Sequence, residues 1–96
     1  MLSYIDKNYG NDMLSVSIIA QEFHMSESYF SQYFKKYADQ TFSKYLETLR
    51  INNACELIKQ TKYTIEEISE KIGYSSALSF RRAFKKVIGM PPSSYR

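Results

Sequence analysis

The residues with the clearest chemistry are two groups of amide and basic side chains, each spaced to share one face of a helix. They are Gln32, Lys35 and Lys36 in one group and Arg82, Lys85 and Lys86 in the other. Side chains three and four residues apart are neighbours on a helix, so each group would present its hydrogen-bond donors together. Lys and Arg suit phosphates, and Arg or Gln fits the edges of bases. The two groups therefore predict contact with DNA.

The distribution of charge supports this interpretation more than its amount does. The 96-residue chain has a net charge of only +3, a modest excess that by itself says little about partners. No Asp or Glu occurs in residues 28–38 or 77–96, whereas Glu66, Glu67 and Glu70 lie together elsewhere. Positive charge is thus concentrated in the two segments that carry the basic groups.

An internal repeat places these two segments in equivalent positions. Residues 19–23 resemble residues 68–72, and residues 30–36 resemble residues 80–86, with one residue added between the two motifs of the second copy. Each copy reads as a short helix, a tight turn and a longer basic helix, which is the outline of a helix-turn-helix. Because the second helix of that motif enters a DNA groove, the repeat predicts a reader of two successive DNA sites.

Helical periodicity and capping signals predict an all-α fold with no strand. The segments expected to be helical are residues 2–9, 16–23, 27–38, 42–60, 65–72 and 77–88, followed by a short turn from Pro92 to residues 95–96. The expected N-caps are Ser15, Ser26, Thr41, Thr64 and Ser76. Glu67 lies three residues after Thr64 and predicts a capping box.

The segment 42–60 has apolar faces that change sides midway. Its early apolar residues are Phe42, Tyr45, Leu46 and Leu49, and its later ones are Ile51, Ala54, Cys55 and Ile58. At about 100° per residue the two sets lie on nearly opposite sides, so this helix needs a different neighbour at each end. We therefore predict one DNA-binding unit with a first helix-turn-helix subdomain (1–41), a linker helix (42–60) and a second subdomain (61–96).

Helical wheels assign the faces of the two basic helices. The expected inner stripes are Phe30, Tyr33, Phe34 and Tyr37 in the first and Phe80, Ala83, Phe84, Val87 and Ile88 in the second. The candidate base contacts on the outer faces are Ser28, Ser31 and Gln32, and Leu78, Ser79, Arg81 and Arg82. Arg82 suits a guanine edge and Gln32 an adenine edge, whereas Leu78 is either a thymine-methyl contact or an ordinary exposed leucine.

Phosphates are the expected partners of the remaining polar residues. Lys35, Lys36, Lys85 and Lys86 lie further along the two helices, where they would set register without reading sequence. Ser15 and Thr64 lie at helix starts and are further candidates to hold phosphate.

Two other classes of function remain as alternatives. The first is a basic helical module that binds an acidic partner protein through the same exposed face. The second, an enzyme, has little support, because the single His24 and the single Cys55 complete neither a metal site nor a Cys–His pair. We expect no catalytic activity, no metal and no cofactor.

The chain shows no sign of a membrane or secretory destination. One cysteine precludes an internal disulfide, no apolar run approaches the roughly 20 residues that span a bilayer, and no signal-peptide pattern is present. We expect a cytoplasmic protein.

These features together resemble the DNA-binding domain of AraC/XylS-type transcriptional regulators. The resemblance covers nearly the whole chain and rests on both motifs, on Arg50 and Ala54, and above all on the closing stretch. That stretch reads Gly73-Tyr74-Ser75-Ser76, Phe80, Phe84-Lys85-Lys86, Gly89-Met90-Pro91-Pro92 and Tyr95-Arg96. Asp39 and His24 stand where family members often have glycine.

The resemblance implies seven helices, two helix-turn-helix subdomains and bacterial transcriptional regulation, most often activation. It places the base contacts on Ser28, Ser31, Gln32, Leu78, Ser79 and Arg82. It also implies RNA polymerase as a partner and a separate sensing, receiver or dimerisation domain, so we expect this chain to be a fragment or an isolated output domain.

Overall fold

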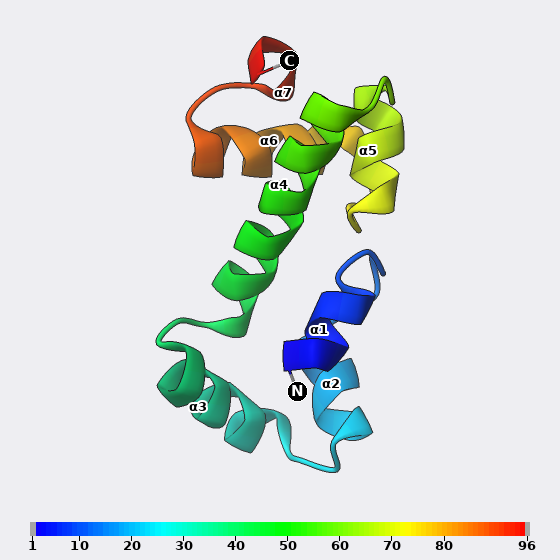
Figure 1. Ribbon diagram of the computed structural model, residues 1–96. Helices are drawn as coiled ribbons and strands as arrows, with labels where there is room; N and C mark the ends of the chain where they lie inside the picture. Colours follow the sequence, from blue (N-terminus) through cyan, green and yellow to red (C-terminus); the bar gives the residue numbers. More distant parts are fainter. Residues whose placement is uncertain (1, 96) are drawn as a thin grey trace.

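The computed structural model describes residues 2–95, which form seven helices and no strand (Figure 1). The helices are α1 (Leu2–Asn8), α2 (Val16–Glu22), α3 (Glu27–Ala38), α4 (Phe42–Gln60), α5 (Ile65–Lys71), α6 (Ala77–Ile88) and α7 (Pro92–Tyr95). The all-α prediction is confirmed, and the helix bounds agree with the expected ones to within a residue. Arg96, expected at the end of the last turn, lies outside the described residues.

All five predicted N-caps are formed. The side-chain oxygen of each cap accepts a hydrogen bond from the backbone N–H three residues later. Thr64 and Glu67 complete the capping box, because the Glu67 carboxylate also accepts from the Thr64 backbone N–H at 3.1 Å. Each such cap stabilises a helix by about 1 kcal/mol, so local chemistry fixes where these helices begin.

The two copies share their backbone turns although the residues differ. After the first helix of each motif, His24 (φ 56°) and Gly73 (φ 99°) both adopt the left-handed conformation. After the second helix, Asp39 (φ 58°) and Gly89 (φ 94°) do the same. A side chain makes this conformation unfavourable by roughly 1–2 kcal/mol, less for Asp, so the first copy carries strain that glycine avoids in the second.

Two hydrophobic clusters lie at opposite ends of α4. Phe42 and Leu46 belong to the cluster built with α1, α2 and α3, whereas Ile51, Ala54 and Ile58 belong to the cluster built with α5 and α6. This division confirms the predicted change of face along the helix. The molecule is elongated as a result, with extents of 40 × 21 × 21 Å.

The predicted inner stripe of α3 is wrong at its tyrosines. Phe30 and Phe34 are buried, but Tyr33 and Tyr37 are 43% and 65% exposed. α3 lies at one end of the elongated molecule and packs mainly against α2 and α4, which leaves the flank that carries the two tyrosines incompletely covered. With Tyr29, the two tyrosines form an exposed ladder of stacked rings whose centroids are 6.4 and 6.0 Å apart.

None of the helices within residues 2–95 combines the length and the apolar character that a bilayer-crossing segment requires.

Candidate nucleic-acid interface

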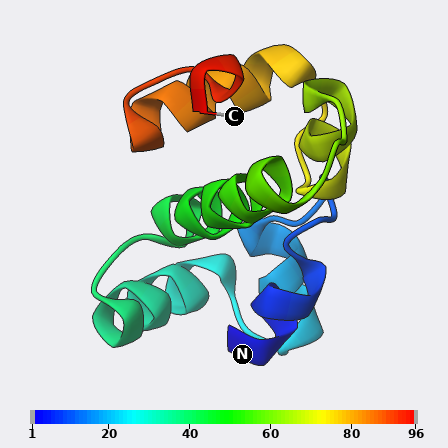
Figure 2. The same cartoon turned by 45° about the horizontal axis from the view of Figure 1, so that its top comes forward.

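The second helices of the two motifs, α3 and α6, are the recognition helices. They lie at opposite ends of α4, and both run from right to left in the views of Figures 1 and 2. Facing segments of the major groove recur about every 34 Å along one side of a duplex, which is within the 40 Å length of the molecule. The length of the molecule is therefore compatible with two recognition helices that lie about one groove repeat apart.

The polar side chains predicted for α3 share its exposed face. Ser28, Ser31 and Gln32 are exposed near its N-terminal half, and Lys35 and Lys36 are exposed near its C-terminal end. The opposite face is anchored by the buried phenylalanines of the first cluster. The helix thus offers small and neutral groups first and cations last.

α6 repeats this arrangement with larger and more basic side chains. Leu78 is 56% exposed, and Ser79, Arg82 and Lys85 are exposed as well. The Ser79 hydroxyl oxygen accepts a hydrogen bond from the Ser76 hydroxyl at 3.0 Å, within the first turn of the helix.

Two of the predicted cations are engaged within the protein. The Arg81 guanidinium lies 2.8 Å from the Glu66 carboxylate of α5, and the Lys86 ammonium lies 3.3 Å from the Glu47 carboxylate of α4. Within residues 2–95 no ion pair involves the other four, which are Lys35, Lys36, Arg82 and Lys85. These four are therefore the cations most available to an external anion.

Ser15 and Thr64 occupy equivalent places, at the starts of α2 and α5. Their hydroxyl oxygens accept from the N–H groups of Ile18 and Glu67, as caps do. Each hydroxyl keeps its own proton for donation to a phosphate oxygen. Ser15 is half-buried and Thr64 is exposed.

Sequence reasoning assigned no contact to Arg50, which lies on α4 between the two apolar sets. Its guanidinium donates to the backbone carbonyls of Tyr9 and Asn11 in the loop after α1. The position of Arg50 between the two apolar sets of α4 was the signal in the sequence that could have indicated a role for it. Its partners lie about 40 residues earlier in the sequence, so only the fold reveals them.

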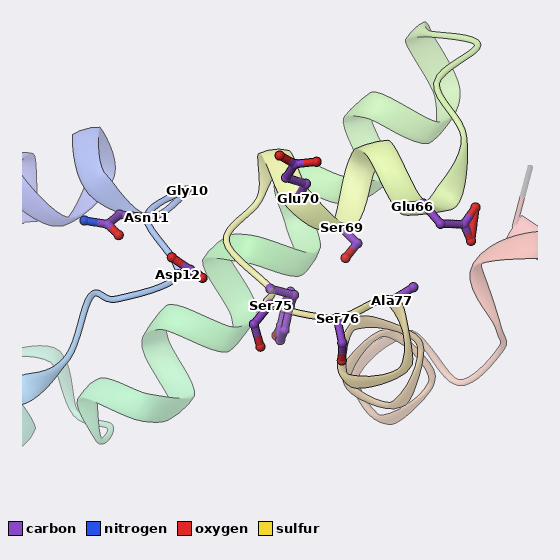
Figure 3. A pocket seen from close by; sticks show the side chains of 10 residues that line it. Gly10, Asn11, Asp12, Glu66, Ser69, Glu70, Ser75, Ser76 and Ala77 are labelled. Carbon is purple, nitrogen blue, oxygen red and sulfur yellow. The ribbon is translucent and has the colours of Figure 1, made fainter.

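A cleft of about 610 Å³ lies between the loop after α1 and the segment that joins α5 to α6. Figure 3 shows Asp12 of that loop facing Ser69, Ser75 and Ser76 across the opening. Glu66 and Glu70 also line the cleft, so its charge is acidic and would repel phosphate. In the described part of the chain no group of three or more His, Cys, Asp or Glu side chains is placed to hold a metal ion.

Comparison with known proteins gives a consistent result. The helix-turn-helix domain family matches residues 19–96. The chain is 34% identical over 92 residues to the Msm operon regulatory protein of Streptococcus mutans, covering 96% of this chain and 33% of the relative. It is 31% identical over 96 residues to the F1 operon positive regulatory protein of Yersinia pestis, covering 100% of this chain and 32% of the relative.

A solved structure shows the same fold over almost the whole chain. The C-terminal domain of AraT, a response regulator from Geobacillus stearothermophilus, is similar with a TM-score of 0.96 and 33% identity, covering 98% of this chain and 78% of that domain. The chain spans about a third of the length of the curated relatives it matches.

Proposed function

The chain belongs to the helix-turn-helix family of AraC/XylS-type transcriptional regulators, and from this membership we propose that it binds double-stranded DNA sequence-specifically to regulate transcription. The observation that carries the proposal is the pair of exposed cationic recognition helices, α3 and α6, which run in the same direction and contain no acidic residue in positions 28–38 or 77–88. This pattern provides base-reading and phosphate-binding groups twice, one groove apart.

The base contacts come from the N-terminal halves of the recognition helices, which reach deepest into the groove. They are Ser28, Ser31 and Gln32 on α3, and Leu78, Ser79, Arg81 and Arg82 on α6. Arg82 provides two parallel donors for the O6 and N7 acceptors of guanine, and Gln32 provides a donor and an acceptor for adenine. α6 carries the larger share of specificity, because the serines of α3 provide only single hydrogen bonds.

The phosphate contacts hold the protein in register. Lys35, Lys36, Lys85 and Lys86 serve at the C-terminal ends of the recognition helices, and the hydroxyls of Ser15 and Thr64 serve at the starts of α2 and α5. The Lys86 ammonium leaves Glu47 for this purpose. Such contacts give affinity that falls with salt and is similar for every sequence.

The chain acts as one unit in three parts: a first helix-turn-helix subdomain (1–41), a linker helix (42–60) and a second subdomain (61–96). α4 spans about 28 Å at 1.5 Å per residue, somewhat less than the groove repeat, so slight bending of the DNA would complete the fit. Because the copies carry different reading residues, the site is asymmetric.

The wider role extends the proposal to the whole protein. The relatives regulate operons, one of them positively, and are about three times as long. We include RNA polymerase and a sensing, receiver or dimerisation domain among the partners, transcriptional activation as the outcome and the cytoplasm as the location. The role is that of a binding protein, without catalysis.

Selection of bound sequences from a randomised duplex pool tests this function. The expected consensus has two unequal half-sites, each being the bases read by one recognition helix, and affinity that falls steeply with salt. Binding without base preference, or binding only to an acidic protein, would instead favour the basic protein-interaction module.

A further inference from the structure

The two subdomains touch each other beside α4 through an unusually close backbone approach. A Cβ atom on Gly10 would lie 2.7 Å from the carbonyl oxygen of Lys71, and one on Gly73 would lie 2.5 Å from that of Tyr9. Both distances are shorter than a side chain permits, so glycine is required on each side. The loop after α1 and the turn after α5 therefore meet directly.

Arg50, in the middle of α4, contacts both of these segments. Its Nε donates to the Tyr9 carbonyl at 2.8 Å and its Nη2 to the Asn11 carbonyl at 2.9 Å. Its guanidinium carbon also lies 5.4 Å from the centre of the Tyr74 ring, which belongs to the second subdomain. One side chain thus joins the linker helix, the first subdomain and the second.

Burial makes these bonds stronger than equivalent ones at the surface. The Arg50 side chain is half-buried, and its desolvation lowers the pKa of the guanidinium, while the nearby Tyr74 and Asp12 act in the opposite direction. An arginine nevertheless keeps its charge at any physiological pH. A charged donor that bonds to carbonyls in such a site is worth more than a neutral one.

We propose that Arg50 is a positioning residue that fixes the two recognition helices relative to each other and so sets the one spacing of half-sites that the protein accepts. This inference rests on the proposed function. α4 alone would leave each subdomain free to rock at its end of the helix. A rock of about 10° over the 28 Å of α4 displaces the far recognition helix by about 5 Å. That is more than the base-pair rise of about 3.4 Å.

The test uses DNA with the selected half-sites separated by the natural spacer, or by one or two base pairs more or fewer. The variant is Arg50→Met, which keeps an unbranched stem and removes the donors. The matched control is Lys59→Met, which removes another cation from α4 that lies over the Tyr95 ring, at 5.2 Å, away from the junction.

We expect wild type and Lys59→Met to lose about tenfold or more in affinity for each shift of the spacer by one base pair. Arg50→Met should lose less than about threefold, while its affinity for an isolated half-site stays at the wild-type value. Arg50→Lys, which retains the charge and one donor, should show an intermediate spacing profile and serves in place of Arg50→Met if that variant does not fold.

An Arg50 variant that binds every spacing more weakly by the same factor would overturn this inference and leave the proposed function intact. A wild-type protein indifferent to spacing would also overturn it. Failure of the wild type to bind any duplex would overturn both.

Discussion

The guanidinium of Arg81 and the carboxylate of Glu66 form a 2.8 Å ion pair between α6 and α5, although Arg81 is one of the side chains proposed to contact bases. Both side chains are well exposed, at 48% and 64%. An exposed pair of this kind contributes about 0–1 kcal/mol to stability, which is less than a contact with DNA provides. The pair is therefore weak enough for DNA to displace it.

Replacing Glu66 should release Arg81 for DNA. We expect Glu66→Gln to bind DNA several-fold more tightly, because a carboxylate near the phosphates is removed, with stability changed by no more than about 1 kcal/mol. Dissociation constants at several salt concentrations and a denaturation curve measure the two effects. Glu56→Gln, on the exposed side of α4, is the control. Unchanged affinity in Glu66→Gln would place Arg81 outside the interface.

Truncation of Arg82 should change the sequence preference of DNA binding, whereas truncation of Lys85 should change only its affinity. Arg82→Ala should lose about 1–3 kcal/mol of binding free energy and relax the preference at one base pair. Lys85→Ala should weaken binding to all sequences alike and reduce the slope of log affinity against log salt by about 1. Shift assays on a set of single-base variant sites distinguish them. If Arg82→Ala discriminated among these sites as wild type does, its assignment as a base contact would be wrong.

Truncation of Phe34 should destabilise the protein by several kcal/mol more than truncation of Tyr37, although both residues belong to the predicted apolar stripe of α3. Phe34 is buried among the rings of Phe30, Phe42 and Tyr45, so Phe34→Ala should lower the free energy of unfolding by about 3–5 kcal/mol. Tyr37→Ala removes one exposed stacked ring and should cost about 1 kcal/mol or less. Urea denaturation followed by helical circular dichroism gives both values. Equal losses would contradict the exposed position of Tyr37.

Glycine should stabilise the protein at His24 and Asp39, the two residues of the first copy with a left-handed backbone conformation. His24→Gly should raise the free energy of unfolding by about 0.5–1 kcal/mol, since relief of strain exceeds the added entropy of the unfolded chain. Asp39→Gly should gain less, because Asp accepts this conformation more readily. His24→Ala is the control, which removes the imidazole and keeps the strain. A glycine variant no more stable than this alanine variant would refute the explanation.

The capping box should give the protein an acid-side dependence of stability. The hydrogen bond from the Thr64 backbone lowers the pKa of Glu67. A carboxyl whose pKa is lower in the folded state stabilises the fold above its unfolded pKa and loses that effect as the pH falls through the folded value. Glu67→Gln should therefore be less stable than wild type at about pH 7, and this difference should shrink at about pH 3, below the ordinary Glu value.

Urea midpoints at the two pH values provide the measurement, and Glu22→Gln at the end of α2 is the control. A difference between Glu67→Gln and wild type that persists unchanged in acid would mean that the charge of Glu67 has no part in the cap.

The caps, the helices and the two faces of α4 were predictable because each depends on neighbours in sequence. A Ser15 or Thr64 hydroxyl finds its partner three residues later, and the change of face in α4 follows from residue spacing alone. The exposure of Tyr33 and Tyr37 was not predictable, because periodicity identifies an apolar side but not whether anything covers it.

The side-chain contacts of the interface needed the fold as well. The outward face of each recognition helix followed from the wheel, and the exposure of Gln32 and Arg82 confirms it. The pairing of Arg81 with Glu66 and the bonds of Arg50 join residues 15 and about 40 positions apart. Such contacts depend on how helices cross, which local chemistry does not specify.

The recognition helices run in the same direction at opposite ends of α4, rather than being related by a two-fold axis. A molecule built this way has a front and a back when it sits on a duplex. Inverting its target within a promoter would reverse the orientation of the bound protein. Its opposite end would then face a protein bound at an adjacent site. Control by such a protein depends on which strand carries the target, a property that palindromic readers lack.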